Sequence, residues 1–391
     1  MSVVFPFALP TTGNLVLSSH VRSIDYQAIV TSADGARAAV RDVLKRAKRA
    51  SSPDTLAVIK AIEEYIPYLF TIIRGVDGGS EFDFVTEVTS TWRMPLRTSR
   101  AQINVIEAPK IEVMGLEFER GMVLLTYALA LIVQSDKVIQ TSSSEDEEQT
   151  TPWKQATSYL LKAESVLSYL SSSPPAIEQQ QGNNTPIDLQ STAISGLSNI
   201  VKGSLHLLIL YKSFNDPAST TSAGLLSRIA IYATEKFSSA SQLLQKPQSK
   251  MKAKVPGFSD ALTTWLANAQ AYTTASAYRY MALESSEKSQ VGRALGLLSL
   301  ASDTIGSMKN RKESEAIFSM GQLLKTDIDA LHQKYKAEND RLTFQKIPDL
   351  KELKYNWPSG REATTLRPPW SPPQSLVHGY TTSNVQHSGY F

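Results

Sequence analysis

The sequence predicts an all-α protein: an irregular, tetratricopeptide-like helical solenoid with short N-terminal strands or an extended N-terminal arm. The first observation is that apolar residues recur at helical spacing in segment after segment between about residues 32 and 340. Each segment has one apolar stripe, so neighbouring helices have to stack against one another to complete a core. The second observation is that the chain shows no repeat of fixed period, which distinguishes it from an ordinary tetratricopeptide array.

The N-terminal part combines an extended region with a first strong helix. Residues 3–17 alternate apolar residues with Pro and Thr, which predicts one or two short strands or an arm lying on the helices. Isoleucines three and four positions apart then mark a helix in residues 59–73. Ser52 followed by Pro53 is typical of an N-cap and a first helical position. Pro67 cannot donate the intrahelical hydrogen bond, so we expect a kink or a restart there.

The same apolar spacing continues along most of the remaining chain and predicts further helices. They are residues 118–132, 153–170, 197–212, 225–237, two helices within 265–301, and 313–341. The last of them would extend over roughly 40 Å at 1.5 Å per residue. We therefore expect it to brace the solenoid.

Polar segments separate the helices and end the domain. Residues 141–152 and 171–186 are rich in Ser, Pro, Glu and Gln, which predicts surface loops. Helical periodicity is lost after about residue 341, and the Pro, Ser and Gly content beyond is typical of disorder. The predicted organisation is a domain of residues 1–361 followed by a disordered, Pro-rich tail of residues 362–391.

Composition excludes several functional classes. The chain has 40 basic and 37 acidic residues, a net charge of +3 that is too even for a dedicated nucleic-acid binder. It has no cysteine, so disulfides and thiolate chemistry are excluded. The longest apolar runs, residues 123–133 and 205–211, are shorter than the roughly 20 residues that cross a bilayer. No secretory signal pattern opens the chain, so we expect a cytoplasmic protein.

The sequence carries no constellation typical of an enzyme. None of its five histidines lies in a metal-binding spacing, and neither a nucleophile elbow nor a phosphate-binding glycine loop is present. We therefore assign no catalytic, cofactor-binding or metal-ligating residue and expect no small-molecule substrate. His206 lies in an apolar run and is interpreted as a core or groove-edge histidine. The competing interpretation, a hydrolase, would require turnover that depends on His206.

Two basic clusters suggest an accessory role at membranes. Residues 41–49 and 246–254 are rich in Lys and Arg, which favour an acidic lipid surface or an acidic partner. A solvated helix face is the more common explanation of such clusters. A helical scaffold that binds acidic membrane without a protein partner is therefore the alternative function.

Residues 265–301 carry the most specific signal in the chain. A Trp is followed by small residues and Tyr at helical spacing, and then by a Gly-Arg pair that opens a helix of Ala and Leu. The residues of this pattern are Trp265, Ala269, Tyr272, Ala275, Tyr280, Gly292 and Arg293. The pattern resembles the signature of the Bro-one domain family, adaptors of the endosomal sorting machinery. Phe118-Glu119-Arg120 and residues 160–170 resemble further family segments in the same order.

The resemblance implies a non-catalytic adaptor with an all-helical fold. Bro-one domains bind the C-terminal amphipathic helix of an ESCRT-III subunit of the Snf, or charged multivesicular body, type. Residues 5–13, 347–354 and 358–362 resemble short members of the family that act in signalling of ambient alkaline pH, where a transcription factor is activated by proteolysis. We therefore expect recruitment to the plasma membrane or the endosome periphery, and contacts with other pH-signalling components.

When the chain is aligned with the family, residues 197–212 and 225–237 correspond to the family's two ligand-binding helices. The apolar residues expected to contact the partner helix are Leu205, Leu208, Ile209, Leu210, Leu225, Ile229 and Tyr232. Of these, the alignment places Ile209 or Leu210, Leu225 and Ile229 at the family's apolar ligand contacts. Charged residues expected at the rim are Lys202, Lys212 and Arg228. The competing interpretation is that these apolar residues belong to the core, because a helix that is apolar all round is buried on most faces.

Overall fold

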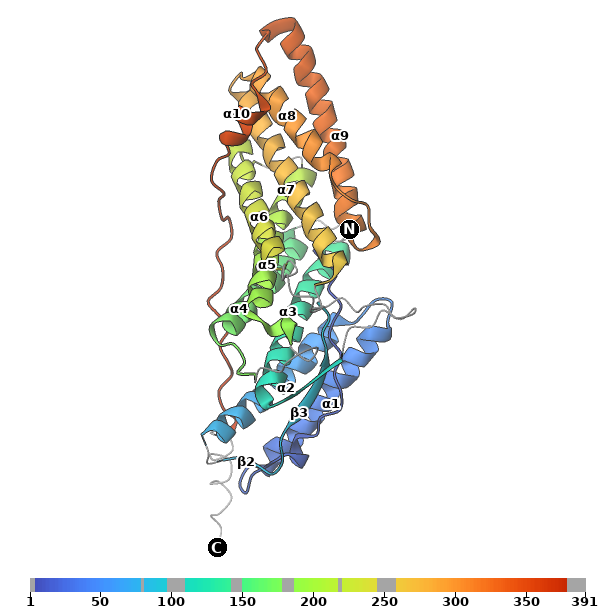
Figure 1. Cartoon of the computed structure of the whole chain (residues 1–391), viewed down its shortest axis with the longest axis vertical. Helices are drawn as coiled ribbons and strands as arrows, with labels where there is room; N and C mark the ends of the chain where they lie inside the picture. The colour runs from blue at the N-terminus through green and yellow to red at the C-terminus, as the bar shows by residue number, and fades with distance from the viewer. Residues whose placement is uncertain are drawn as a thin grey trace, which may run out of the picture.

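A computed structural model describes residues 4–78, 81–96, 110–141, 150–177, 186–216, 220–244 and 258–377. Successive helices pack against one another in chain order and form an elongated, all-helical stack (Figure 1). The helices are α1 (Gln27–Arg49), α2 (Thr55–Asp77), α3 (Leu116–Thr141), α4 (Thr150–Ser172), α5 (Ser191–Asn215), α6 (Ala223–Leu243), α7 (Asp260–Glu287), α8 (Val291–Gly306), α9 (Glu315–Glu338) and α10 (Leu350–Tyr355). The predicted all-α solenoid is confirmed.

Short strands lie at the α1–α2 end of the stack. β1 (Val21–Arg22) pairs with β2 (Asp83–Phe84), and β3 (Thr89–Arg93) forms an antiparallel hairpin with β4 (Lys110–Met114). The N-terminal arm adds to the β3 edge: the Gly13 N–H donates to the Thr91 carbonyl over 2.8 Å. The arm is thus extended chain held by backbone hydrogen bonds, as the sequence predicts.

Local details of α2 differ from the prediction. The N-cap is Asp54, whose carboxylate accepts a hydrogen bond from the Ala57 N–H, so the helix begins two residues later than Ser52 and Pro53 suggest. The helix also continues through Pro67 as one element. Most of α2 is buried between α1 and α3, and this packing holds the helix together although one hydrogen bond is missing.

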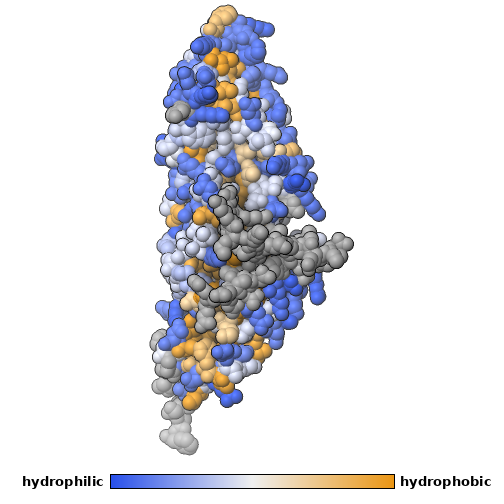
Figure 2. Space-filling model, viewed as in Figure 1, coloured by the Kyte–Doolittle hydropathy of each residue, from blue (hydrophilic) through white to orange (hydrophobic). Residues whose placement is uncertain are grey.

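In the described part of the chain, two helices are long and apolar enough to cross a membrane by length and composition, α3 and α5. In α3, 83% of the apolar window is buried inside the protein, and in α5 72%. Figure 2 shows apolar residues in scattered groups among hydrophilic ones on the visible face, without a continuous apolar belt. We therefore interpret α3 and α5 as the core helices of the stack.

A buried ion pair joins the first helices to the hairpin. The Arg37 guanidinium on α1 donates to the Glu119 carboxylate on α3 over 2.5 Å, and both side chains are at most 1% exposed. Glu119 also accepts from the Trp92 Nε1–H on β3 and from the Tyr65 hydroxyl on α2. Burial and the Glu119 charge raise the pKa of Tyr65, which stays a neutral donor. Arg37 further donates to the Thr12 hydroxyl of the arm.

Residues 356–377, which we call the C-terminal segment, differ from the prediction of a disordered tail after residue 361. After α10 the chain runs back in extended form along the stack and reaches the α2 end (Figure 1). Residues 362–377 lie on the helices, where Leu366, Trp370, Leu376 and Val377 pack against the core, a contact that composition alone does not reveal. The remaining tail residues, 378–391, lie outside the described part of the chain, as do most of the predicted loop 141–152, residues 178–185 of the second loop and the basic cluster 246–254.

Substituting Glu119→Gln is expected to lower the free energy of unfolding by about 3–5 kcal/mol, because Arg37 is left buried without its counter-charge. The amide of the substituted side chain would also place an N–H₂ donor next to the donors of Arg37, Trp92 and Tyr65. Urea denaturation measures the change, with Glu112→Gln on the exposed face of β4 as the control. A loss below about 1 kcal/mol would show that this pair does not hold the helices and the hairpin together.

Candidate partner-binding face on helices α5 and α6

The structure divides the predicted apolar residues into two groups. Four of them are core residues with at most 2% of their surface exposed: Leu205, Leu208, Leu210 and Ile229. Ile209 on α5, and Leu225 and Tyr232 on α6, are only partly buried. Leu225 and Tyr232 are seven positions apart, so they lie on the same side of α6. Because α5 and α6 pack side by side, Ile209, Leu225 and Tyr232 form a partly buried row on two adjacent helices.

The predicted rim charges lie around this row in different environments. Lys202 forms an ion pair with the buried carboxylate of Glu164 on α4, with 3.4 Å between Nζ and Oε1. The Arg228 Nε–H donates to the Ser359 carbonyl over 3.2 Å. Lys212 is half-buried near the end of α5 and forms no ion pair with the residues that the structure describes. Lys212 is therefore the rim cation with the greatest freedom to meet an acidic group.

The C-terminal segment crosses the same face of α6. The Arg361 N–H donates to the Arg228 carbonyl over 2.9 Å, and the Tyr232 hydroxyl donates to the Glu362 carboxylate over 2.8 Å. A Cβ atom added to Gly360 would lie 2.8 Å from the backbone N and Cα of Tyr232. The segment approaches α6 so closely that only glycine fits at position 360.

His206 fastens the segment to α5. Its Nδ1 lies 2.7 Å from the Lys202 carbonyl, which can only accept, so Nδ1 carries the proton. Its Nε2 then accepts the Ala363 N–H over 2.9 Å. Burial lowers the pKa of His206, which favours the neutral ring that this pair of hydrogen bonds requires. The interpretation as a core or groove-edge histidine is confirmed: the residue is fully buried and lies under the segment.

Two tryptophans anchor the segment at either end. Trp357 stacks edge-on against Tyr278 of α7, with 4.9 Å between the ring centroids, and packs against the buried cluster of α5 and α6. Trp370 packs between Phe70 and Tyr169 at 5.6 and 5.2 Å, and its backbone N–H donates to the Ser165 carbonyl. The segment is thus part of the folded domain from α7 to α2.

This docking differs from the predicted disordered tail, although the sequence carries signals for it. Pro-Ser-Gly at residues 358–360 and the two tryptophans are unusual in a passive tail. What the sequence does not show is which helix faces they meet, because the contacts join residues more than 100 positions apart.

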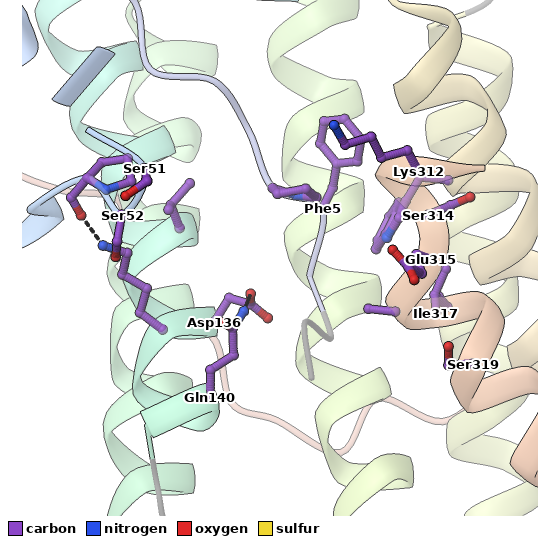
Figure 3. Close-up of a pocket in the computed structure, with 16 residues that line it drawn as sticks. Phe5, Ser51, Ser52, Asp136, Gln140, Lys312, Ser314, Glu315, Ile317 and Ser319 are labelled. Carbon is purple, nitrogen blue, oxygen red and sulfur yellow. Dashed lines mark hydrogen bonds between the residues drawn. The ribbon is translucent and has the colours of Figure 1, made fainter. Parts of the chain in front are cut away.

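A separate hollow of about 580 Å³ lies between α3, the start of α9 and the N-terminal arm. Figure 3 shows Asp136 and Gln140 on one wall and Lys312 and Glu315 across from them. Asp136 accepts hydrogen bonds from the Val4 N–H and from the Gln140 amide, which fixes the arm to α3. In the part of the chain that the structure describes, no group of acidic or histidine side chains could hold a metal ion.

The fold and this face define a helical-stack binding domain. The chain belongs to the BRO1-like domain family, which matches residues 19–373. The resemblance to the Bro-one domain family is therefore confirmed. Family membership points to a non-catalytic adaptor and not to an enzyme.

Curated relatives place the chain among the pH-response regulators. It is 32% identical to the pH-response regulator protein palC of Yarrowia lipolytica, over 98% of this chain and 97% of the relative. It is 24% identical to palC of Emericella nidulans, over 95% of this chain and 90% of the relative.

Solved structures show the same fold. The BRO1 domain of ALIX in complex with CHMP4C superposes with a TM-score of 0.68 and 14% identity, over 95% of this chain and 97% of that chain. A Bro1 domain described as the basis of endosomal targeting superposes with a TM-score of 0.63 and 18% identity, over 98% and 96%.

Gly360→Ala is expected to detach the C-terminal segment from α6, since the added methyl group would collide with the Tyr232 backbone. Limited trypsin digestion measures the effect as faster cleavage after Arg361. Gly306→Ala is the matched control, because a Cβ atom there meets nothing within 4 Å. Equal cleavage rates in both variants and the wild type would contradict the close contact.

Docking of the segment is expected to weaken as the pH falls. The folded pKa of His206 lies below its ordinary value of about 6.5, so the unfolded chain binds more protons between these two values. The contribution to stability is fully present above pH ~6.5 and is lost as the pH falls through the folded pKa. Melting temperatures at pH 7.5 and 5.5 should differ more in the wild type than in His206→Gln. The same difference in both proteins would disprove the role of the neutral ring.

Proposed function

We propose that this protein is a non-catalytic adaptor whose α5–α6 face binds the C-terminal amphipathic helix of an ESCRT-III subunit of the Snf type. The observation that carries the proposal is the surface row of Ile209, Leu225 and Tyr232 on two adjacent helices. An amphipathic helix presents apolar residues at spacings of three and four, which fits such a row. The structurally similar BRO1 domain of ALIX was solved in complex with CHMP4C, which supports this kind of partner.

The C-terminal segment limits where the partner helix can lie on α5 and α6. Ser359, Gly360 and Glu362 contact α6 near Arg228 and Tyr232, so this part of the row is already shared. Among the residues that the structure describes, no hydrogen bond joins the segment to Ile209 or Leu225, although Trp357 packs on the cluster beneath them. We therefore centre the partner helix on Ile209 and Leu225, with Lys212 meeting an acidic residue of the partner.

The biological setting follows from the relatives. They are named as pH-response regulators, which fits recruitment of an ESCRT-III subunit to a complex that signals ambient alkaline pH. In this proposal the protein joins the partners at the plasma membrane or endosome periphery, and a separate protease activates the transcription factor. The chain itself performs no chemistry.

Leu225→Asp is expected to weaken binding of a labelled C-terminal helix peptide of the Snf-type subunit by about thirtyfold. A carboxylate in the centre of an apolar contact removes a contribution of roughly 2 kcal/mol. Fluorescence anisotropy measures the affinity. Ile229 is a poor choice for this test because its side chain is 2% exposed and its loss would disturb folding.

Leu323→Asp on α9 is the matched control, since Leu323 is 52% exposed and distant in sequence from α5 and α6. Both variants should keep the wild-type melting temperature. Binding that survives in Leu225→Asp would move the partner site elsewhere on the stack. No binding by the wild type would overturn the proposal itself.

A further inference from the structure

A second hollow, of about 380 Å³, lies between the C-terminal half of α1, the arm and the hairpin. Among the described residues that line it, none is a carboxylate and five are cationic: Lys45, Lys48, Arg49, Arg93 and Lys110. The whole chain has a net charge of only +3, so this is a strong local concentration of positive charge. We call this site the basic hollow.

The hairpin brings two of these cations together. Arg93 on β3 is directly opposite Lys110 on β4 in the antiparallel register. Like charges at directly opposite positions destabilise a strand pair. The Glu112 carboxylate on β4 is opposite Thr91 and does not line the basic hollow.

Helix α1 supplies the other three cations. Lys45, Lys48 and Arg49 lie within about one turn near the end of α1. Lys45 and Arg49, like Lys110 across the hollow, form no ion pair within the described part of the chain. A bound anion would relieve the repulsion among these charges.

The floor of the basic hollow is rigid. The arm is fixed to β3 by two backbone hydrogen bonds, from the Gly13 N–H to the Thr91 carbonyl and from the Arg93 N–H to the Thr11 carbonyl. Beneath them Trp92 is fully buried and donates to Glu119. Cations held around a rigid floor lose little conformational freedom on binding a ligand.

We propose that the basic hollow binds the phosphate groups of a phosphorylated inositol. Each phosphate carries about −1.5 to −2 charges at neutral pH, so two of them balance the three cations Lys45, Arg49 and Lys110, whereas one carboxylate balances only one. A volume of about 380 Å³ is of the size that small-ligand sites have. Because the cations surround one hollow and do not follow a groove, a compact ligand fits better than an extended acidic peptide.

This site is separate from the α5–α6 face, so either proposal can fail without the other. The phosphorylated inositol has two sources, a soluble inositol polyphosphate or the headgroup of a phosphoinositide in a membrane. Both present the same phosphate chemistry to the five cations. The experiment therefore has one arm for each source.

The test titrates the full chain with inositol hexakisphosphate by calorimetry, and with vesicles containing 5% phosphatidylinositol bisphosphate. The variant Lys45→Gln/Lys48→Gln/Arg49→Gln removes three cations of the basic hollow. Arg46→Gln is the control on the same helix, because Arg46 is exposed and does not line the hollow. At about fivefold per charge, the triple variant should bind roughly a hundredfold more weakly, while Arg46→Gln changes by no more than severalfold.

The outcomes separate the two sources. If the wild type binds both the soluble ligand and the vesicles, and the triple variant loses both, the result supports a membrane headgroup. If the wild type binds only the soluble ligand, and the triple variant loses that binding, the result supports a soluble ligand. Unchanged binding by the triple variant overturns the proposal. So does equal binding to phosphatidylserine vesicles of matched charge, which would show non-specific attraction.

Discussion

The buried pair of Arg37 and Glu119 is the interaction on which the rest of the structure depends. It joins α1 to α3, and through Trp92, Tyr65 and Thr12 it adds the hairpin, α2 and the N-terminal arm. Removing a carboxylate from water is favourable only when several donors replace the water, and here three different side chains donate to it. The position of the hairpin against α1, and therefore the basic hollow, follows from this one centre.

Along the length of the stack, the C-terminal segment has a similar organising role. Helices α4, α5 and α6 each leave one face open, and the segment crosses these faces through His206, Tyr232 and Trp370. It covers part of the surface that the proposed partner helix would use. Affinity for the partner is therefore set by the exposed row and by how firmly the segment is held.

The sequence predicts the helices well because their apolar spacing is strong and local. It cannot say which apolar residues reach the surface: Leu225 and Ile229 share one stripe, yet Ile229 is buried and Leu225 is only partly so. That difference depends on how α5, α7 and the segment pack around α6. The basic hollow is likewise invisible in the sequence, because Lys45 and Lys110 meet only after the hairpin folds onto α1.

The central claim is that one face of α5 and α6 receives an amphipathic helix. Hydrogen–deuterium exchange of the full chain, with and without the C-terminal helix peptide of the Snf-type subunit, tests it most directly. The account predicts slower exchange in residues 202–215 and 222–232, with the far helices α1 and α9 unchanged. Protection that appears only on α1, α9 or the hairpin would contradict it.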